Sequence, residues 1–325
     1  MNSSRIKLTI VCIVVLMLGF SSLIRAEEDD DVTGIYNQIR AQGAKYQVEE
    51  SIHYITNFGM TMKCTLAVPK TNTSRPIILI LHGFGGDRNG FPITGTGERF
   101  FERTARILAE QGFCSFRVDF RGCGENAGDY SVTTFSGQVS DAKVALNYIE
   151  TLADPVDPRR IGLLGHSQGG LVSTLTAASD ERIDSLMLWA AVNNPAHDYE
   201  GLFKKSGFKK GLAMPNGTSD IFPLYVDDVK VLDYPIRKEF FVEIFNTNPL
   251  LAISTFKKPM MYIAALQDVI VWPQPLVGQT YLLYHEGYEK LVSVDASHNY
   301  NFDIGPDVMD EVIYWTAAWY IKTLQ

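Results

Sequence analysis

A serine with glycine two residues before it and two residues after it closes a short apolar run. Residues 161–170 read IGLLGHSQGG, so Gly165, Ser167 and Gly169 form a G-x-S-x-G pattern. The apolar run predicts a strand that ends at Gly165, and the residues from Gln168 onward predict a helix. A sharp turn between such a strand and helix exposes the serine hydroxyl and strains its backbone. The pattern therefore predicts that Ser167 is a nucleophile for acyl transfer.

A serine hydroxyl attacks a carbonyl only when a base removes its proton and a third group holds that base. Asp268 comes two residues after the apolar run that ends at Leu266, and His298 comes four residues after Val294. Because parallel strands bring their carboxyl ends to one edge of a sheet, we expect both side chains near Ser167. The predicted triad is Ser167, Asp268 and His298.

An oxyanion that forms beside the serine needs two converging N–H groups. The residue after the nucleophile begins a helix, so the backbone N–H of Gln168 is one expected donor. The loop His82-Gly83-Phe84-Gly85-Gly86 follows the apolar run 76–81 and can approach the same edge. We expect the second donor to be the backbone N–H of Phe84.

Other histidines and acidic residues compete for these roles. His82 is an alternative base, and Asp198, which follows another apolar run, is an alternative acid. His166 is interpreted as a residue that shapes the turn, and Asp119 as a carboxylate that anchors a loop. Asp295 stands too close to the predicted base along one strand to orient it easily.

Several other chemistries lack their sequence signatures. The sequence contains neither G-x-x-x-x-G-K-[ST] nor H-E-x-x-H, and the glycines of residues 122–128 lack the dinucleotide spacing. A net charge of −8 disfavours nucleic acid as a partner. We therefore expect no cofactor, no metal and no nucleic acid, and a small-molecule ester as substrate. The oligomeric state stays open.

The elements that must position these residues alternate along the chain. Short apolar runs at 76–81, 113–120, 161–165, 186–191, 259–266 and 291–294 are separated by helical patterns. This rhythm predicts an α/β fold with a mostly parallel central sheet and helices on both faces. The two runs in 48–69 flank Asn57-Phe58-Gly59 and predict a β-hairpin.

The rhythm breaks over about residues 193–258, a segment that is rich in aromatic residues. An insertion between two core strands is a candidate lid over the site. About half of its aromatic residues would form its own core, and the others an apolar acyl pocket. We expect short or aromatic acyl groups to be preferred over long chains. Peptides would be poor substrates, because no carboxylate pair for an amino terminus is evident.

The N-terminus carries a targeting pattern. Arg5 and Lys7 precede the apolar run 8–24, and Ala26 precedes an acidic run. We interpret residues 1–26 as a secretory signal peptide, with an uncleaved membrane anchor as the alternative. Residues 27–46 then form a polar linker with a short helix, and 47–325 the main domain. The protein would be secreted or periplasmic, or membrane-anchored if the segment is retained.

Five short segments together resemble the α/β-hydrolase fold, and in particular its cinnamoyl/feruloyl esterase-like branch. They are 81–86 (LHGFGG), 119–124 (DFRGCG), 165–170 (GHSQGG), 268–271 (DVIV) and 297–298 (SH). The similarity extends from about Glu50 to the C-terminus. The resemblance implies a Ser167–Asp268–His298 triad, donors at Phe84 and Gln168, and an inserted lid that forms the acyl pocket. Glutamine after the nucleophile is similar to that branch.

These observations predict a serine carboxylester hydrolase for short-chain or hydroxycinnamoyl-type esters, working through an acyl-enzyme. Two alternatives stay open: a serine peptidase or aminopeptidase of the same fold, and a catalytically silent relative used for binding.

Overall fold

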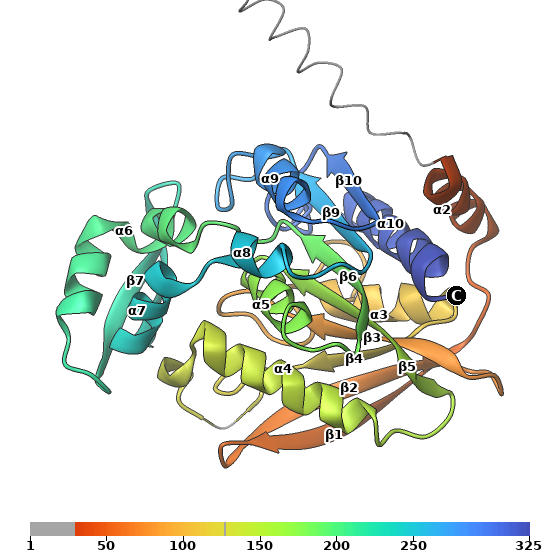
Figure 1. Cartoon of the computed structure of the whole chain (residues 1–325), viewed down its shortest axis with the longest axis horizontal. Helices are drawn as coiled ribbons and strands as arrows, with labels where there is room; N and C mark the ends of the chain where they lie inside the picture. Colours follow the sequence, from red (N-terminus) through yellow and green to blue (C-terminus); the bar gives the residue numbers. More distant parts are fainter. Residues whose placement is uncertain (1–29, 127) are drawn as a thin grey trace, which may run out of the picture.

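The central feature of the fold is an eight-stranded β-sheet (Figure 1). The computed structural model describes residues 30–126 and 128–325. The strands lie in the order β1-β2-β4-β3-β5-β6-β9-β10; β1 and β2 run antiparallel to their neighbours, and the pairs from β4 to β10 are parallel. The strands are β1 Val48–Asn57, β2 Met60–Pro69, β3 Arg75–Leu81, β4 Cys114–Val118, β5 Val156–His166, β6 Ile183–Trp189, β9 Met260–Ala265 and β10 Glu289–Val294.

Helices cover both faces of this sheet and bury two separate cores. One core takes residues from α2 (Asp30–Gln42), α3 (Phe100–Glu110) and α10 (Asp307–Leu324). The other takes residues from α4 (Phe135–Ile149), α5 (Gln168–Ala177) and α9 (Leu276–Tyr284). Successive residues of a strand point to opposite faces, so Ile78 belongs to the first core and Leu79 to the second. The predicted mostly parallel sheet with helices on both faces is confirmed, as is the hairpin of β1 and β2.

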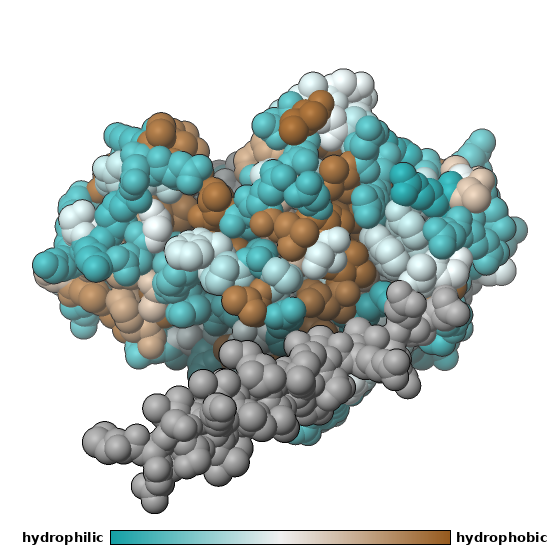
Figure 2. Space-filling model, turned by 90° about the horizontal axis from the view of Figure 1, so that it is seen from above, coloured by the Kyte–Doolittle hydropathy of each residue, from teal (hydrophilic) through white to brown (hydrophobic). Residues whose placement is uncertain are grey.

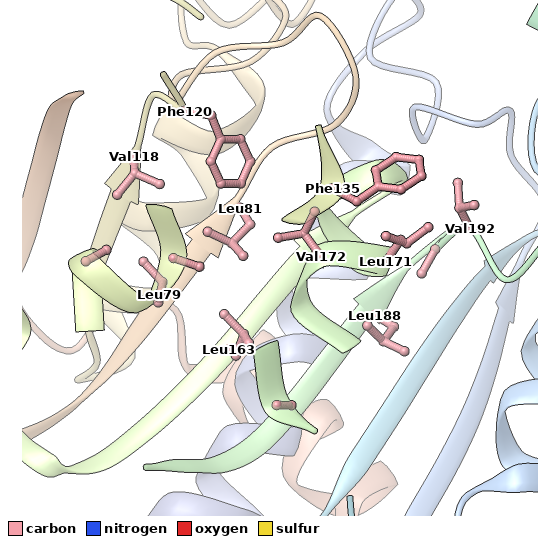
Figure 3. Close-up of a cluster of buried hydrophobic side chains, with 14 of the residues drawn as sticks. Leu79, Leu81, Val118, Phe120, Phe135, Leu163, Leu171, Val172, Leu188 and Val192 are labelled. Atoms are coloured by element: carbon pink, nitrogen blue, oxygen red, sulfur yellow. The ribbon is translucent and has the colours of Figure 1, made fainter. Parts of the chain in front are cut away.

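Residues of the core beneath α4 and α5 are drawn in Figure 3. Strand residues such as Leu79, Leu81 and Leu163 meet helix residues such as Phe135 and Leu171, and all are fully buried. Burial of each such side chain is worth about 1.5–3 kcal/mol. This packing fixes α5 against the sheet from Leu171 onward.

An insertion stands between β6 and β9 and leaves the sheet (Figure 1). We call its first four elements the lid: α6 Pro195–Ala213, β7 Ser219–Val226, β8 Val229–Arg237 and α7 Lys238–Asn246. The short helix α8 (Pro249–Ile253) leads back to the sheet. The lid has its own aromatic core, formed by the buried side chains of Phe203, Phe208, Phe222, Phe240 and Phe241. These five are half of the ten Phe and Tyr residues in 193–258.

The N-terminal helix α2 packs against the last helix of the chain. The rings of Tyr36 and Trp315 stack with centroids 4.2 Å apart, and Lys322 pairs with Asp31. The predicted signal peptide over residues 1–26 lies outside the described residues. Within the part of the chain that the structure describes, no helix combines the length and apolar character needed to cross a bilayer.

Ser167 occupies a rare backbone conformation between β5 and α5, with φ 57° and ψ −121°. A Cβ at Gly165 would collide with the Gly169 carbonyl, and a Cβ at Gly169 would collide with the carbonyls of Leu81 and His82. Glycine is therefore required at both positions, because backbone from two neighbouring segments occupies the space of a side chain. The Ser167 N–H donates to the Trp189 carbonyl at 2.9 Å, which ties the turn to β6.

This crowding predicts opposite effects of alanine at two helical glycines. Gly169→Ala should lower the free energy of unfolding by about 2 kcal/mol or more, since the obstructing atoms are backbone. Gly34→Ala in α2 should raise it by about 0.5–1 kcal/mol, because nothing lies within 4 Å of the added methyl group. Urea unfolding of both variants measures the difference, and equal stability of the two would contradict the role of Gly169.

Candidate active site

Three residues singled out in the sequence stand in loops at one edge of the sheet. Ser167 follows β5, Asp268 follows β9, and His298 follows β10. These strands belong to the parallel run β5-β6-β9-β10, so their carboxyl ends share an edge. The exposed fractions are 8% for Ser167, 6% for Asp268 and 7% for His298. All three side chains are therefore largely shielded from water.

Asp268 and His298 are in direct contact. His298 Nδ1 lies 2.6 Å from Asp268 Oδ2, and Asp268 Oδ1 accepts the backbone N–H groups of Ile270 at 2.7 Å and Val271 at 2.9 Å. These bonds fix the carboxylate, which then fixes the tautomer of the ring: Nδ1 carries the proton and Nε2 is available as a base. No hydrogen bond joins the Ser167 hydroxyl to His298 among the described residues, and such bonds often tighten only when substrate binds.

His166 connects the turn at Ser167 to the loop that carries His298. Its Nε2 donates to the His298 carbonyl at 3.0 Å, and the two rings have centroids 5.0 Å apart. Burial and the neighbouring His298 lower the pKa of His166 to about 3. His166 is thus a neutral donor that holds two loops together, in line with the turn-shaping role expected for it.

The loop after β3 lies against the turn at Ser167. A Cβ on Gly83 would come within 3.2 Å of the Ser167 Cβ, so the backbone beside Phe84 reaches the nucleophile candidate. Gln168 is the first residue of α5, where the N–H groups have no acceptor within the helix. The structure therefore brings both expected oxyanion donors, Phe84 N–H and Gln168 N–H, to the neighbourhood of Ser167.

His82 uses both ring nitrogens within the protein. Its Nε2 accepts the Phe120 N–H at 3.3 Å, so its Nδ1 donates to the Gly83 carbonyl at 2.8 Å. Burial lowers the pKa of His82, which keeps the ring neutral. With both nitrogens occupied, His82 has no free position from which to act as a base. Its bonds instead shape the loop that carries Phe84.

Asp198, the alternative acid, does not contact His298. Its Oδ1 lies 3.1 Å from His197 Nδ1, and its Oδ2 is buried without a hydrogen-bond partner. Burial raises the pKa of Asp198 to about 7, an effect that His197 opposes and the charge of Asp268 reinforces. The sequence suggested only an acid role at this position. The structure adds a buried carboxylate close to the Asp268–His298 pair, with one oxygen left over.

Asp198 also lines a pocket of about 190 Å³ between the lid and the loop after Asp268. Its lining is mixed: Leu202, Val226, Val269 and Ile270 are apolar, and Asp198, Lys204, Asp227 and Asp228 are charged. Exposed apolar residues continue along the loop after Asp268 and along α9; they include Trp272, Leu276 and Leu283. In Figure 2, apolar surface (brown) gathers in the middle of the face seen from above. An apolar surface beside the site favours substrates with an apolar part.

Asp119, which the sequence singled out as a loop anchor, has a structural role. Asp119 accepts the Arg88 N–H at 2.6 Å and pairs with Arg88 Nη1 at 2.6 Å, so it anchors a loop as the sequence suggests. Within residues 30–126 and 128–325, no group of three or more histidine, cysteine or acidic side chains could hold a metal ion.

Comparison with known proteins identifies the fold. A family model described as "alpha/beta hydrolase fold" matches residues 76–223. The quorum-quenching protein AidA of Acinetobacter baumannii is 31% identical over 129 residues, which are 39% of each chain. The first curated relatives are matched over only about 40% of their own length.

Solved structures are similar over most of the chain. Est1E from Butyrivibrio proteoclasticus with bound ferulic acid has a TM-score of 0.62 at 22% identity, covering 81% of this chain and 97% of that one. The esterase domain of a Rhodothermus marinus protein has a TM-score of 0.62 at 19% identity, covering 86% and 100%. With the family model, these likenesses show that the chain has the α/β-hydrolase fold.

The buried carboxylate of Asp198 predicts a specific dependence of stability on pH. The carboxyl titrates near pH 7 in the folded protein and near 3.8 when unfolded, so the folded state binds more protons between these values. The contribution of Asp198 to the free energy of unfolding should therefore fall as pH rises from about 4 to about 7 and then level off. Asp198→Asn removes this cost and should raise the Tm by at least about 2 °C at pH 8, and by less at pH 5.

Thermal unfolding of wild type and Asp198→Asn at both pH values measures this difference. Asp303→Asn is a matched control, because Asp303 is exposed. If the Tm gain of Asp198→Asn is the same at pH 5 and pH 8, the buried carboxyl does not titrate between them.

Proposed function

We propose that this protein is a serine hydrolase that cleaves carboxylic esters through an acyl-enzyme. The observation that carries the proposal is the 2.6 Å contact between Asp268 and His298 at the same sheet edge as Ser167, whose backbone is in the strained φ 57° conformation. Ser167 is the nucleophile, His298 the base and Asp268 the group that holds it. The N–H groups of Phe84 and Gln168 are the oxyanion donors.

The geometry supports a two-step reaction. Ser167 Oγ attacks the ester carbonyl carbon as His298 Nε2 takes its proton, and the carbonyl oxygen becomes an oxyanion between the two backbone N–H groups. The intermediate collapses to an acyl-enzyme as the alcohol leaves with the proton from His298. Water then attacks the acyl carbon by the same path and releases the acid. Asp268 stabilises the imidazolium in both steps, and the N-terminus of α5 favours the oxyanion.

The pocket between the lid and the loop after Asp268 does not include Ser167 in its lining, and its small size favours a short or aromatic group there over a long chain. Its volume of about 190 Å³ is below the roughly 300–1,000 Å³ of typical small-molecule sites. Two of the structural neighbours are an esterase domain and Est1E with bound ferulic acid. These two proteins support esters as the substrates of this one, and the ferulic acid complex supports hydroxycinnamic acids as acyl groups.

One observation favours a second candidate, the hydrolysis of aminoacyl esters or amides. The expectation that peptides are poor substrates relied on the lack of an evident carboxylate for an amino terminus. Asp198 is a buried carboxylate near the Asp268–His298 pair, and its Oδ2 has no hydrogen-bond partner. An ammonium group in the pocket would give this oxygen a donor and stabilise its ionised form. Asp227 and Asp228 also line the pocket, with Lys204 as a counter-charge.

The catalytic assignment predicts the effect of removing one oxygen atom. Ser167→Ala should lower kcat for p-nitrophenyl butyrate by roughly 10³-fold or more, because no other nucleophile stands at the turn. A fluorophosphonate probe should label wild type at Ser167, and mass spectrometry of the labelled peptide identifies the site. A folded Ser167→Ala protein that keeps a tenth of its activity would sink the assignment, and an unlabelled, inactive wild type would indicate a catalytically silent protein.

The pocket predicts the order of substrates. Butyrate or ferulate esters should exceed palmitate esters in kcat/KM by at least about tenfold, or about 1.4 kcal/mol of transition-state preference. An aminoacyl anilide should be slower than butyrate if the first candidate holds. If the anilide wins and Asp198→Asn removes its advantage while leaving butyrate turnover within twofold, the second candidate holds instead. A preference for palmitate contradicts both readings of the pocket.

A further inference from the structure

Both proposed oxyanion donors are attached to the lid through their own side chains. We propose that the lid positions the oxyanion hole, with Tyr199 as the positioning residue for Gln168 and the lid's aromatic core as the support of Phe84. This inference rests on the proposed function, since it concerns the same site. It assigns to the lid a part in the chemical step in addition to any part in binding the acyl group.

The side chain of Gln168 is held at both ends. Tyr199, on lid helix α6, donates its hydroxyl to Gln168 Oε1, and Gln168 Nε2 donates to Gln138 Oε1 at 2.7 Å. Gln138 Nε2 in turn donates to Thr133 Oγ1 at 3.1 Å. Burial raises the pKa of Tyr199 well above its usual value, so the hydroxyl keeps the proton that it donates. Gln168 is therefore clamped between the lid and α4.

Phe84 is attached to the lid by ring contacts. Its ring lies 5.1–5.9 Å, between centroids, from five other aromatic rings. Four of them belong to the lid, namely Tyr199, Phe203, Tyr234 and Phe240. Each such pair contributes about 0.5–1.5 kcal/mol beyond the area that it buries. The backbone of Phe84 therefore cannot shift without disturbing the core of the lid.

The next residue of the same loop is held as well. Gly85 donates its N–H to the Tyr130 hydroxyl at 3.1 Å, and it has φ 66°. A Cβ at this position would collide with the hydroxyl of Tyr234, which lies on lid strand β8. The rings of Tyr130 and Tyr234 are 4.9 Å apart. The loop thus sits between a hydrogen-bond acceptor on the main domain and a tyrosine of the lid.

Loss of these contacts should affect catalysis and not substrate binding. The Tyr199 hydroxyl bonds to the side chain of Gln168, the Phe84 ring is the side chain of the other donor residue, and neither Tyr199 nor Phe84 lines the pocket described above. Loosening them should let the N–H groups move away from the position of the oxyanion, while the acyl pocket stays as it is. When an N–H group is badly placed for the oxyanion, the transition state is stabilised less, and kcat falls.

The test is the variant Tyr199→Phe, which removes one hydroxyl and keeps the ring. We expect kcat for p-nitrophenyl butyrate to fall about tenfold, with KM within twofold; complete loss of a donor costs about 10²–10³-fold. Inhibition by a trifluoromethyl ketone of matching chain length should weaken by the same factor as kcat/KM, because its Ser167 adduct carries an oxyanion. The plain methyl ketone, which binds without that charge, should be unaffected.

Tyr148→Phe is the matched control. The Tyr148 hydroxyl is 2.9 Å from His53 Nδ1 on the edge strand β1, at the opposite end of the sheet from β10, so this variant should keep kcat within twofold.

Phe84→Leu tests the second attachment, since it keeps the backbone N–H and removes the ring. It should lower kcat and trifluoromethyl ketone affinity together, even if the Tm of Tyr199→Phe proves too low for assay.

The outcomes separate this inference from the function beneath it. If wild type turns over esters and Tyr199→Phe and Phe84→Leu both keep full kcat, the lid does not position the donors and the inference is overturned. It is overturned equally if the variants raise KM alone, because that result assigns these residues to substrate binding. If wild type itself neither hydrolyses esters nor labels at Ser167, the proposed function fails and the inference falls with it.

Discussion

The left-handed backbone of Ser167 is the constraint on which the rest of the site depends. A non-glycine residue with φ 57° and ψ −121° costs about 1–3 kcal/mol, and it persists only where the flanking structure overrides the preference. Here β5 is paired on both sides within the sheet, and α5 is packed on a core of buried apolar side chains. Gly165 and Gly169 have no side chains, so neighbouring backbone can approach closely enough for the strand and the helix to meet at this angle.

The same tight turn explains why residues from two other loops gather around it. Leu81 and His82 place their carbonyls where a Gly169 side chain would be, and Gly83 lies against the Ser167 Cβ. His166 reaches across to the His298 carbonyl. Burial lowers the pKa of both His82 and His166, so these rings act as neutral hydrogen-bonding links. The buried edge can then hold several histidines without accumulating positive charge.

Local sequence patterns predicted the sheet and the loops of the candidate site. They did not predict the contacts between distant segments that hold these loops in place. The alternation of apolar runs and helices predicts the sheet because each strand carries its own signal. It also puts Asp268 and His298 in successive loops, which the structure brings to 2.6 Å. Tyr199 and Gln168 lack such a signal, because their bond depends on how the lid folds back over α5. The sequence likewise could not predict that Asp198 Oδ2 is buried without a hydrogen-bond partner, because this depends on which segments pack around it.

The lid therefore combines two demands that are usually separate. Its phenylalanines must form a core to fold an insertion that leaves the main sheet, and Phe240 and Phe203 also contact Phe84. A substitution that repacks this core would move the loop beside Ser167 even though it touches no substrate. A buried hydrogen bond such as that of Tyr199 is costly to leave half made, since Gln168 would keep an unsatisfied amide oxygen. In the mechanism proposed above, the contacts that hold the lid against the main domain are therefore also those that hold Phe84 and Gln168 in place.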